Sequence, residues 1–284
     1  MIYVSSSCVK HKKIKDSVQE LANSGFRNIE LSGGTEYYDG FEDDLLELKA
    51  KYNLNYICHN YFPPPKEHFV VNLASLDDTI YSKTLEHLTN SILLSKLLGS
   101  DKFGFHAGSF IDVHVSEIGK KISKTNLYDT QKAIQRFIDG YRLLENIVPN
   151  IKLYIENNVF SKTNYDTYNG KQFFMLCTYE DYIELKQKLE FGLLLDIAHI
   201  KVSSNVLGIS LETQLKNMLD VSEYIHISDN DGLHDTNHAF GKEADIIKIL
   251  KQTNNLKEKI FTLEIYEDIA TIMKTYKTLQ EAIV

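Results

Sequence analysis

Six short apolar segments of this 284-residue chain break off at residues that can bind a metal ion. The segments read YICHN, FGFHAG, YIENN, LLLDIAHI, YIHISDND and FTLEIY. Their β-branched and aromatic residues favour buried strands, and a strand with a purely structural role does not need an ionisable group at its end. The ionisable residues are His59, His106, Glu156, Asp196, His199, His226 and Glu264. Converging strand ends with nitrogen and oxygen ligands predict a metal-centred active site.

Four of these residues are the expected ligands of one divalent ion: Glu156, Asp196, His226 and Glu264. They come from four different segments, so they could surround an ion at a common edge. Carboxylates combined with imidazole suit Zn²⁺, Mn²⁺ or Co²⁺, whereas an all-oxygen set would suit Mg²⁺ or Ca²⁺. One ion is the minimum, and a second ion bridged by Glu156 stays open.

Three more histidines are candidates for additional metal binding or for substrate contacts. His59 and His106 end two neighbouring segments, and His199 follows Asp196 by three residues, as a turn after the strand would allow. The remaining candidates are weaker because they lie in expected loops, on an expected helix or without partners: His11, His68, His87 and His114. We expect these four to have no site role.

Strands and helices must alternate along the chain to bring these residues together. Strand patterns begin at IYVSSS, NIELSG, YICHNYF, KFGFHAG, KLYIENN, FGLLLDIAHI, YIHISDN and IFTLEIY. Helical patterns, with apolar residues at helix spacing or a terminal glycine, cover residues 14–25, 43–53, 78–99 and 178–190. Eight strands that are each followed by a helix predict an α/β protein, a (β/α)8 TIM barrel forming a single domain over residues 1–284. In such barrels the C-terminal strand ends face the catalytic mouth.

The composition is that of an average globular protein, with 43% hydrophobic and 25% charged residues. No apolar run approaches the roughly 20 residues that cross a bilayer, and MIYVSSSCVKHKK lacks the order of a secretory signal. We therefore expect a cytoplasmic protein without a membrane partner. Three cysteines without a CxxC pair make a disulfide framework unexpected. The net charge of −8 opposes the positive field typical of proteins that track phosphate backbones.

The segments, taken in order, resemble the xylose-isomerase-like barrel superfamily over essentially the whole chain. That superfamily contains sugar and sugar-phosphate isomerases and epimerases, and also endonuclease IV. The motifs that carry the resemblance are His59 with FVVNLAS downstream, FHAGS, IENN, DIAH, HISDNDG, DTNHAFG and LEIY. Each motif alone is weak, and their order and spacing are specific.

The resemblance implies roles for individual residues. In the isomerases and epimerases, the positions matching Glu156, Asp196, His226 and Glu264 hold one divalent ion, often manganese or cobalt. The two glutamates double as acid and base there, and the position of His199 contacts the substrate. In endonuclease IV a three-zinc cluster uses the positions matching His59, His106, Glu156, Asp196, His199, His226, Asp235 and Glu264.

One further ligand of that zinc cluster is a histidine two residues after the position of Asp235. Here Asn237 stands at that place, and His238 follows it. Either His238 serves after a shift of one residue, or the third metal site is incomplete. The resemblance therefore leaves the number of ions open.

The loop after the second expected strand, GGTEYYDGFEDD, argues against DNA binding. It contains five acidic residues: Glu36, Asp39, Glu42, Asp43 and Asp44. They would repel a phosphate backbone, so a nucleic acid partner is not expected.

These observations predict a divalent-metal-dependent isomerase or epimerase of a small sugar or sugar phosphate, in which Glu156 and Glu264 are the catalytic residues. They would transfer a proton through a metal-stabilised enediolate, with Mn²⁺, Co²⁺ or Zn²⁺ as cofactor. The alternative is an endonuclease IV-like zinc phosphoesterase that acts on abasic DNA with two or three zinc ions. A lyase or dehydratase, a non-catalytic binding module and a homo-oligomeric state also stay open.

Overall fold

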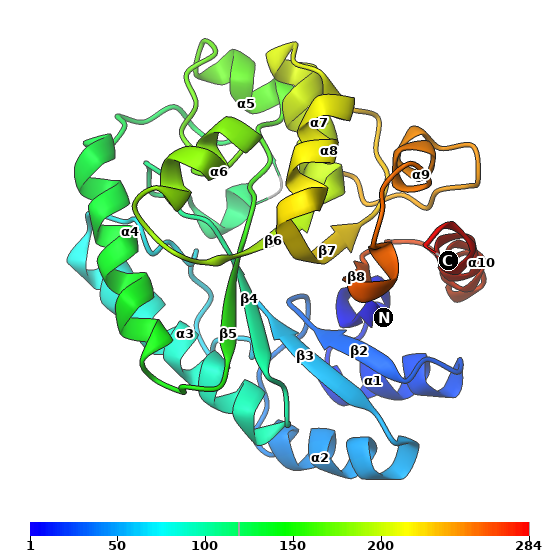
Figure 1. The fold of residues 1–284 in the computed structure, drawn as a ribbon. Helices are drawn as coiled ribbons and strands as arrows, with labels where there is room; N and C mark the ends of the chain where they lie inside the picture. The colour runs from blue at the N-terminus through cyan, green and yellow to red at the C-terminus, as the bar shows by residue number, and fades with distance from the viewer. Residues whose placement is uncertain (119, 284) are drawn as a thin grey trace.

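The computed structural model describes residues 1–118 and 120–283. Within these residues, eight parallel strands close into one barrel in chain order (Figure 1). The strands are β1 (Ile2–Ser5), β2 (Asn28–Leu31), β3 (Asn55–His59), β4 (Lys102–His106), β5 (Lys152–Glu156), β6 (Gly192–Asp196), β7 (Ser222–Ile227) and β8 (Ile260–Leu263). The predicted (β/α)8 barrel is therefore confirmed.

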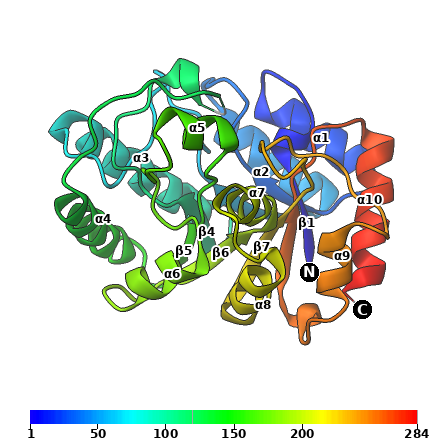
Figure 2. The same cartoon turned by 90° about the horizontal axis from the view of Figure 1, so that it is seen from above.

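The helices lie around the outside of the strands (Figures 1 and 2). They are α1 (Ile14–Asn23), α2 (Phe41–Tyr52), α3 (Asp78–Leu97), α4 (Thr130–Glu145), α5 (Lys162–Thr167), α6 (Tyr179–Lys186), α7 (Ile197–Leu207), α8 (Leu211–Val221), α9 (Asp245–Leu250) and α10 (Ile269–Ala282). Short 3₁₀ helices add η1 (Ser6–Cys8), η2 (Val115–Glu117) and η3 (Leu256–Glu258). In the part of the chain that the structure describes, no helix combines the length and apolarity needed to cross a membrane.

The barrel interior changes from apolar to ionisable along β3, β5, β6 and β7. In the middle part of the strands, inward side chains form a small buried cluster of Tyr3, Ile57, Tyr154, Leu194 and Tyr224. Side chains two residues apart on a strand face the same side, so the next inward layer consists of His59, Glu156, Asp196 and His226. The apolar layer therefore forms a packed floor beneath the ionisable one.

Gly104 on β4 shows how tightly these layers meet. A Cβ atom at this position would lie 2.6 Å from Leu194 Cδ1 and 3.0 Å from His59 Cδ2. Only glycine leaves room there for the His59 ring.

Two strand segments expected from the sequence continue into other structure. Ser6–Cys8 forms η1 after β1, and Ile197 begins α7 immediately after β6. The reason is local at β6, because Asp196 is the N-cap of α7 and its side chain accepts a hydrogen bond from His199 N. His199 thus lies in the first helical turn, where the sequence analysis expected a simple turn.

Candidate metal centre and active site

Glu156 lies at the centre of the ionisable layer and is fully buried. Its Oε2 is 2.7 Å from His59 Nε2 and 3.1 Å from His106 Nδ1. Its Oε1 is 3.3 Å from His226 Nδ1. One carboxylate from β5 therefore faces imidazoles from β3, β4 and β7.

Glu264 follows β8 and approaches the same centre from the other side. Its Oε2 is 3.4 Å from His226 Nδ1. Its Oε1 accepts hydrogen bonds from Tyr266 OH at 3.0 Å and from Ser7 Oγ at 3.3 Å. The carboxylate is thus held in a fixed orientation at the edge of the cluster.

Asp196, His199 and Asp235 form the third side. The Oδ1 of Asp196 caps α7, and its Oδ2 lies 3.8 Å from His199 Nε2. The same Nε2 is 3.3 Å from Asp235 Oδ2, and His199 Nδ1 lies 2.7 Å from the Asn157 carbonyl oxygen. Asp196 therefore keeps one carboxylate oxygen directed toward the cluster.

Potential ligand atoms gather into three overlapping groups, within each of which they lie within 4.8 Å of one another. The groups are His59, Glu156 and His226; Glu156, Asp196 and His199; and Asp196, His226 and Glu264. Since each group shares a residue with another, they form one continuous cluster. All four core ligands expected from the sequence belong to it.

Unpartnered polar atoms show that this cluster fits a cation. Glu156 Oε1, His226 Nδ1 and His106 Nδ1 are buried without a hydrogen-bond partner among the residues described. A buried polar atom left unsatisfied costs about 1–3 kcal/mol, and these atoms face one another across the cluster. Carboxylate oxygens and imidazole nitrogens are the ligands of Zn²⁺ and similar ions. The donor set therefore fits a divalent metal ion.

The electrostatics keep the glutamates ionised. Burial alone would raise the pKa of the Glu156 carboxyl, but three neighbouring imidazoles outweigh burial and leave it well below its ordinary value. Burial also opposes ionisation of Glu264, yet its contact with His226 lowers its pKa to about 2. Burial lowers the pKa of His106 to about 4 despite the nearby Glu156 carboxylate. Ionised carboxylates and a neutral imidazole are the forms that bind metal.

Asp196 behaves differently from the two glutamates. Burial raises its pKa to about 7 despite the nearby His199, and the carboxylates of Glu156 and Asp235 contribute to the increase. Negative charge is therefore crowded on this side of the cluster, and a bound cation would relieve that crowding.

Sequence reasoning missed Glu30, which is fully buried on β2 beneath the cluster. Its Oε2 accepts hydrogen bonds from Thr262 Oγ1 at 2.8 Å and from Tyr224 OH, and lies 3.0 Å from His226 Nε2. A signal was present in NIEL, where an acidic residue separates two apolar ones. With Ile29 and Leu31 packed in the outer core, alternation places Glu30 inside the barrel.

The other candidates divide into those at the cluster and those apart from it. A cavity of about 880 Å³ opens at the mouth, and its walls include His59, His106, Glu156, His199, Asp235, Asn237 and Glu264. His238 lies apart: its side chain is 61% exposed and its Nδ1 is 3.6 Å from Glu267 Oε1. Asn237 takes the inward place instead, where its Nδ2 donates to the Glu264 carbonyl oxygen.

The four histidines expected to have no site role are spread over the fold. His11 also lines the mouth cavity, with its Nε2 2.5 Å from Glu20 Oε2. His68 and His114 border a separate cavity of about 200 Å³, and His87 is buried in α3. The three cysteines are buried and free, as expected.

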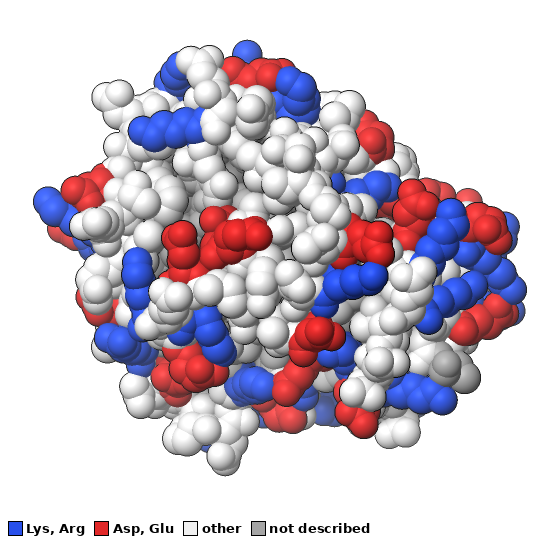
Figure 3. Space-filling model, turned by 45° about the horizontal axis from the view of Figure 1, so that its top comes forward, with Lys and Arg blue, Asp and Glu red and all other residues white. Residues whose placement is uncertain are grey.

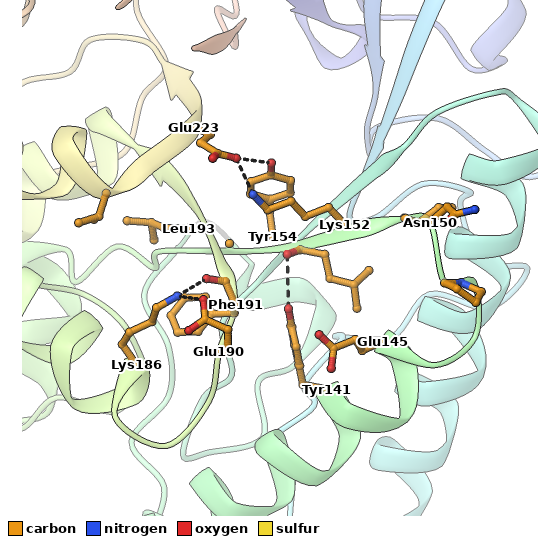
Figure 4. Close-up of a pocket in the computed structure, with 15 residues that line it drawn as sticks. Tyr141, Glu145, Asn150, Lys152, Tyr154, Lys186, Glu190, Phe191, Leu193 and Glu223 are labelled. Carbon is orange, nitrogen blue, oxygen red and sulfur yellow. Dashed lines mark hydrogen bonds and ion pairs between the residues drawn. The ribbon is translucent and has the colours of Figure 1, made fainter. Parts of the chain in front are cut away.

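A further cavity, of about 560 Å³, lies at the N-terminal strand ends (Figure 4). Four of its charged side chains form ion pairs with one another. Lys152 Nζ is 2.5 Å from Glu223 Oε2, Tyr154 OH donates to the same carboxylate, and Lys186 contacts Glu190. Because this face of a TIM barrel usually serves stability and most of its charged groups pair internally, we assign it a structural role.

Comparisons with known proteins agree with this geometry. A family model described as a xylose isomerase-like TIM barrel matches residues 18–282. A D-tagatose 3-epimerase-like protein has 17% sequence identity and a TM-score of 0.74, with 99% of this chain and 96% of that chain covered. Endonuclease IV from Thermus thermophilus also has 17% identity, with a TM-score of 0.61 and 99% of both chains covered.

An L-ribulose 3-epimerase has 14% identity and a TM-score of 0.65, with 99% of this chain and 90% of that chain covered. At these identities the likeness shows the fold alone. A comparison with curated proteins gave no match.

Proposed function

Because the chain belongs to the xylose isomerase-like TIM barrel family, we propose that it is a divalent-metal-dependent isomerase or epimerase of a sugar or sugar phosphate. The observation that supports this most is the placement of Glu156 and Glu264 on either side of His226 Nδ1, at the base of the mouth cavity. Solved structures of similar fold are named as sugar epimerases, which favours the same class of substrate.

Glu156, Asp196, His226 and Glu264 would hold the ion. When bound, it would polarise a substrate carbonyl and the adjacent hydroxyl, and stabilise the charge of the enediolate. His59, His106 and His199 border the cavity, where they would contact substrate oxygens or a further ion. Mn²⁺, Co²⁺ and Zn²⁺ are the candidate ions because the donor set mixes nitrogen and oxygen atoms.

The proton transfer is assigned to the two glutamates, because they approach the cavity from different strands. Glu264 is the more accessible, with 18% of its side chain exposed compared with 0% for Glu156. Its pKa of about 2 keeps it in the carboxylate form, which can accept a proton but is a weak base. Glu264 would remove the proton next to the carbonyl. Glu156 is a carboxylate at the start, so it would first take up a proton from solvent and then deliver it from the other side. Return to the same carbon gives epimerisation, and return to its neighbour gives isomerisation.

The alternative is a zinc phosphoesterase acting on abasic DNA. The observation in its favour is that His59, His106 and Asp235 all reach the cavity. Two features oppose it: His238 lies outside the cluster, and Lys and Arg are scattered among Asp and Glu on the face shown in Figure 3. A duplex-binding protein normally gathers basic residues on one face.

Two measurements test the proposal. Metal content per chain is counted by emission spectroscopy after loading with Mn²⁺, Co²⁺ or Zn²⁺ and gel filtration. Deuterium incorporation is followed for a panel of ketoses and ketose phosphates in heavy water. We expect one tightly held ion and exchange at the carbon next to the carbonyl.

Two or three zinc ions per chain, together with nicking of abasic duplex and no exchange on any sugar, would establish the alternative. The metal-stripped protein is the control for the exchange reaction, since it keeps both glutamates.

A further inference from the structure

The mouth cavity extends well beyond the ligand cluster. Its volume of about 880 Å³ is near the upper end of the roughly 300–1,000 Å³ usual for small-molecule sites. Toward β1 and β2 its lining is polar, with Ser6, Ser7, Lys10, Ser32 and Thr35. Toward the loops after β3, β4 and β5 it is apolar, with Val70, Val71, Val113, Ile118, Ile122 and Phe174. We call this second side the apolar wall.

The apolar wall is built into the fold. Ile122 is only 4% exposed and belongs to a separate buried cluster with Phe160, Phe173 and Tyr168. Val113 and Phe174 pack against that cluster. The loops after β4 and β5 thus share a small core of their own, which holds the wall in place.

Backbone hydrogen bonds join the same two loops. Ser109 and Phe174 form an antiparallel bridge. Phe110 N donates to the Phe173 carbonyl oxygen at 2.7 Å, and Met175 N donates to that of Gly108 at 2.9 Å. These bonds fix the part of the wall around Phe174 before any ligand arrives, which lowers the cost of ordering it on binding.

The wall carries more apolar surface to the cavity than a small polar substrate would use. Ile118 is 45% exposed, and Val70, Val71, Val113 and Phe174 are half-buried beside it. A contiguous apolar surface next to a reaction centre is typical of a ligand-binding groove. Glu156, Glu264, Ile118 and Phe174 line the same cavity, so a molecule bound at the metal centre could extend toward the wall.

We propose that the substrate is a sugar derivative with an apolar alkyl or aryl substituent, and that this substituent packs against Val71, Ile118 and Phe174. This inference rests on the proposed function, because the metal centre fixes where the reacting oxygens lie. The polar side near β1 and β2 then faces the sugar hydroxyls. A bare sugar phosphate would leave the wall in contact with water.

A homologous series of hydroxamates tests the wall, because a hydroxamate offers a metal two adjacent oxygens, as the substrate would. Acetohydroxamate, butanohydroxamate, hexanohydroxamate and benzohydroxamate are compared with gluconohydroxamate, whose tail is a polyol. Dissociation constants are measured by calorimetry on the metal-loaded protein. We expect about a four-fold decrease for each methylene that reaches the wall, and weaker binding of gluconohydroxamate than of hexanohydroxamate.

Substitutions in the apolar wall test whether the gain in affinity from the alkyl tail comes from contacts with the wall. Ile118→Ser and Phe174→Ser should each reduce the gain from the alkyl tail several-fold, while Ile209→Ser, an exposed apolar residue outside the cavity lining, should not change it. Acetohydroxamate has no tail beyond one methyl group, so equal binding to all variants shows that fold and metal are retained.

Dissociation constants that do not fall with tail length, or equal binding of the polyol tail, overturn the apolar subsite and leave the proposed function standing. Failure of acetohydroxamate to bind the metal-loaded protein counts against the proposed function instead. That result also removes the premise for a substrate substituent at the wall.

Discussion

Glu264 has the orientation and the access that a proton acceptor needs. Ser7 and Tyr266 hold its Oε1, its Oε2 faces His226, and part of the side chain is open to the cavity. The hydrogen bonds hold it in place without an active-site movement, which is the arrangement that favours general base catalysis.

Replacing Glu264 with Gln should abolish proton exchange while leaving the fold intact. The amide has the same shape and can still accept from Ser7 and Tyr266, but it has no charge with which to take up a proton. We expect a loss of about 10³-fold in deuterium incorporation. Tyr266→Phe removes only one hydrogen bond to Glu264 and should cost far less. Near-normal exchange by Glu264→Gln would disprove the assignment.

Glu30 has a different role, because it acts on the cluster through His226. It lies 3.0 Å from Nε2, so a proton on that nitrogen leaves Nδ1 free to face Glu156 and Glu264. Such a carboxylate behind a ligating histidine orients the ring and increases its basicity.

We therefore expect Glu30→Gln to weaken metal binding by about 10–100-fold. The measurement is a competition titration of Zn²⁺ or Mn²⁺ against a chelator, which does not depend on activity. Thr262→Val is the matched control, since it removes another hydrogen bond to Glu30 and none to His226. If Glu30→Gln binds metal as tightly as the unchanged protein, Glu30 has only a structural role.

The positions of Glu156, Asp196, His226 and Glu264 in the cluster were predictable because each interrupts an apolar strand at its end. The alternation in NIEL could have placed Glu30 inside the barrel, but its contacts were not predictable. Its partners Tyr224, His226 and Thr262 come from strands almost 200 residues or more away. His238 and Asn237 illustrate the same limit. Their loop is irregular, and only its path in space, with Asn237 inward and His238 outward, decides which of them faces the cluster.

At the scale of the elements, the strands were predictable from their β-branched composition, and their number predicted the barrel. The positions at which the strands end were less predictable. LLLDIAHI reads as one continuous apolar run, yet the strand ends at Asp196 because its side chain caps α7. A helix cap competes with strand extension at this point, and the run itself does not reveal which prevails.

Helix α3 contains an ionisable residue that makes stability depend on pH. His87 is 8% exposed, and its Nε2 has no hydrogen-bond partner within the described ranges. Its ring lies edge-on to Phe69, with 5.7 Å between centroids. Burial lowers the pKa of His87 from 6.5 to about 4.

Since the unfolded chain binds a proton at His87 more readily than the folded one, stability should fall as pH decreases from 6.5 to about 4. The difference in pKa corresponds to about 3 kcal/mol over that range. Above the ordinary pKa of histidine, His87 is neutral in both states and has no effect. His87→Leu should lose this contribution, as measured by urea unfolding at several pH values. His114→Gln, at an exposed position, should keep it, and equal slopes for His87→Leu and the unchanged protein would contradict the prediction.

At the scale of the whole molecule, the barrel is closed by contacts between the two ends of the chain. β1 pairs with β8 in parallel, from Ile2 with Phe261 to Val4 with Leu263. The amino group of Met1 donates to the Lys259 carbonyl oxygen at 2.8 Å. Because the ring closes only when its first and last strands meet, we propose that residues 1–284 unfold as one unit.

The floor and the mouth of the barrel have opposite effects on the stability of the metal-free protein. The floor is close-packed, whereas the mouth keeps like-charged carboxylates and unpartnered imidazole nitrogens buried together. An arrangement of this kind lowers the stability of the metal-free protein and increases what a bound cation contributes. Metal binding should therefore increase the stability of the entire domain.

Adding the cognate divalent ion to chelator-treated protein should raise the unfolding temperature of a single cooperative transition. At a free metal concentration of about 100 times the dissociation constant, linkage stabilises the folded state by about 2.7 kcal/mol, which for a chain of this size corresponds to about 5 °C. Scanning calorimetry measures it, with Mg²⁺ as a control that the mixed donor set should bind weakly. Glu30→Gln should need an about 10–100-fold higher metal concentration for the same shift. An unfolding temperature that no divalent ion changes would show that the buried carboxylates and imidazoles do not form a metal site.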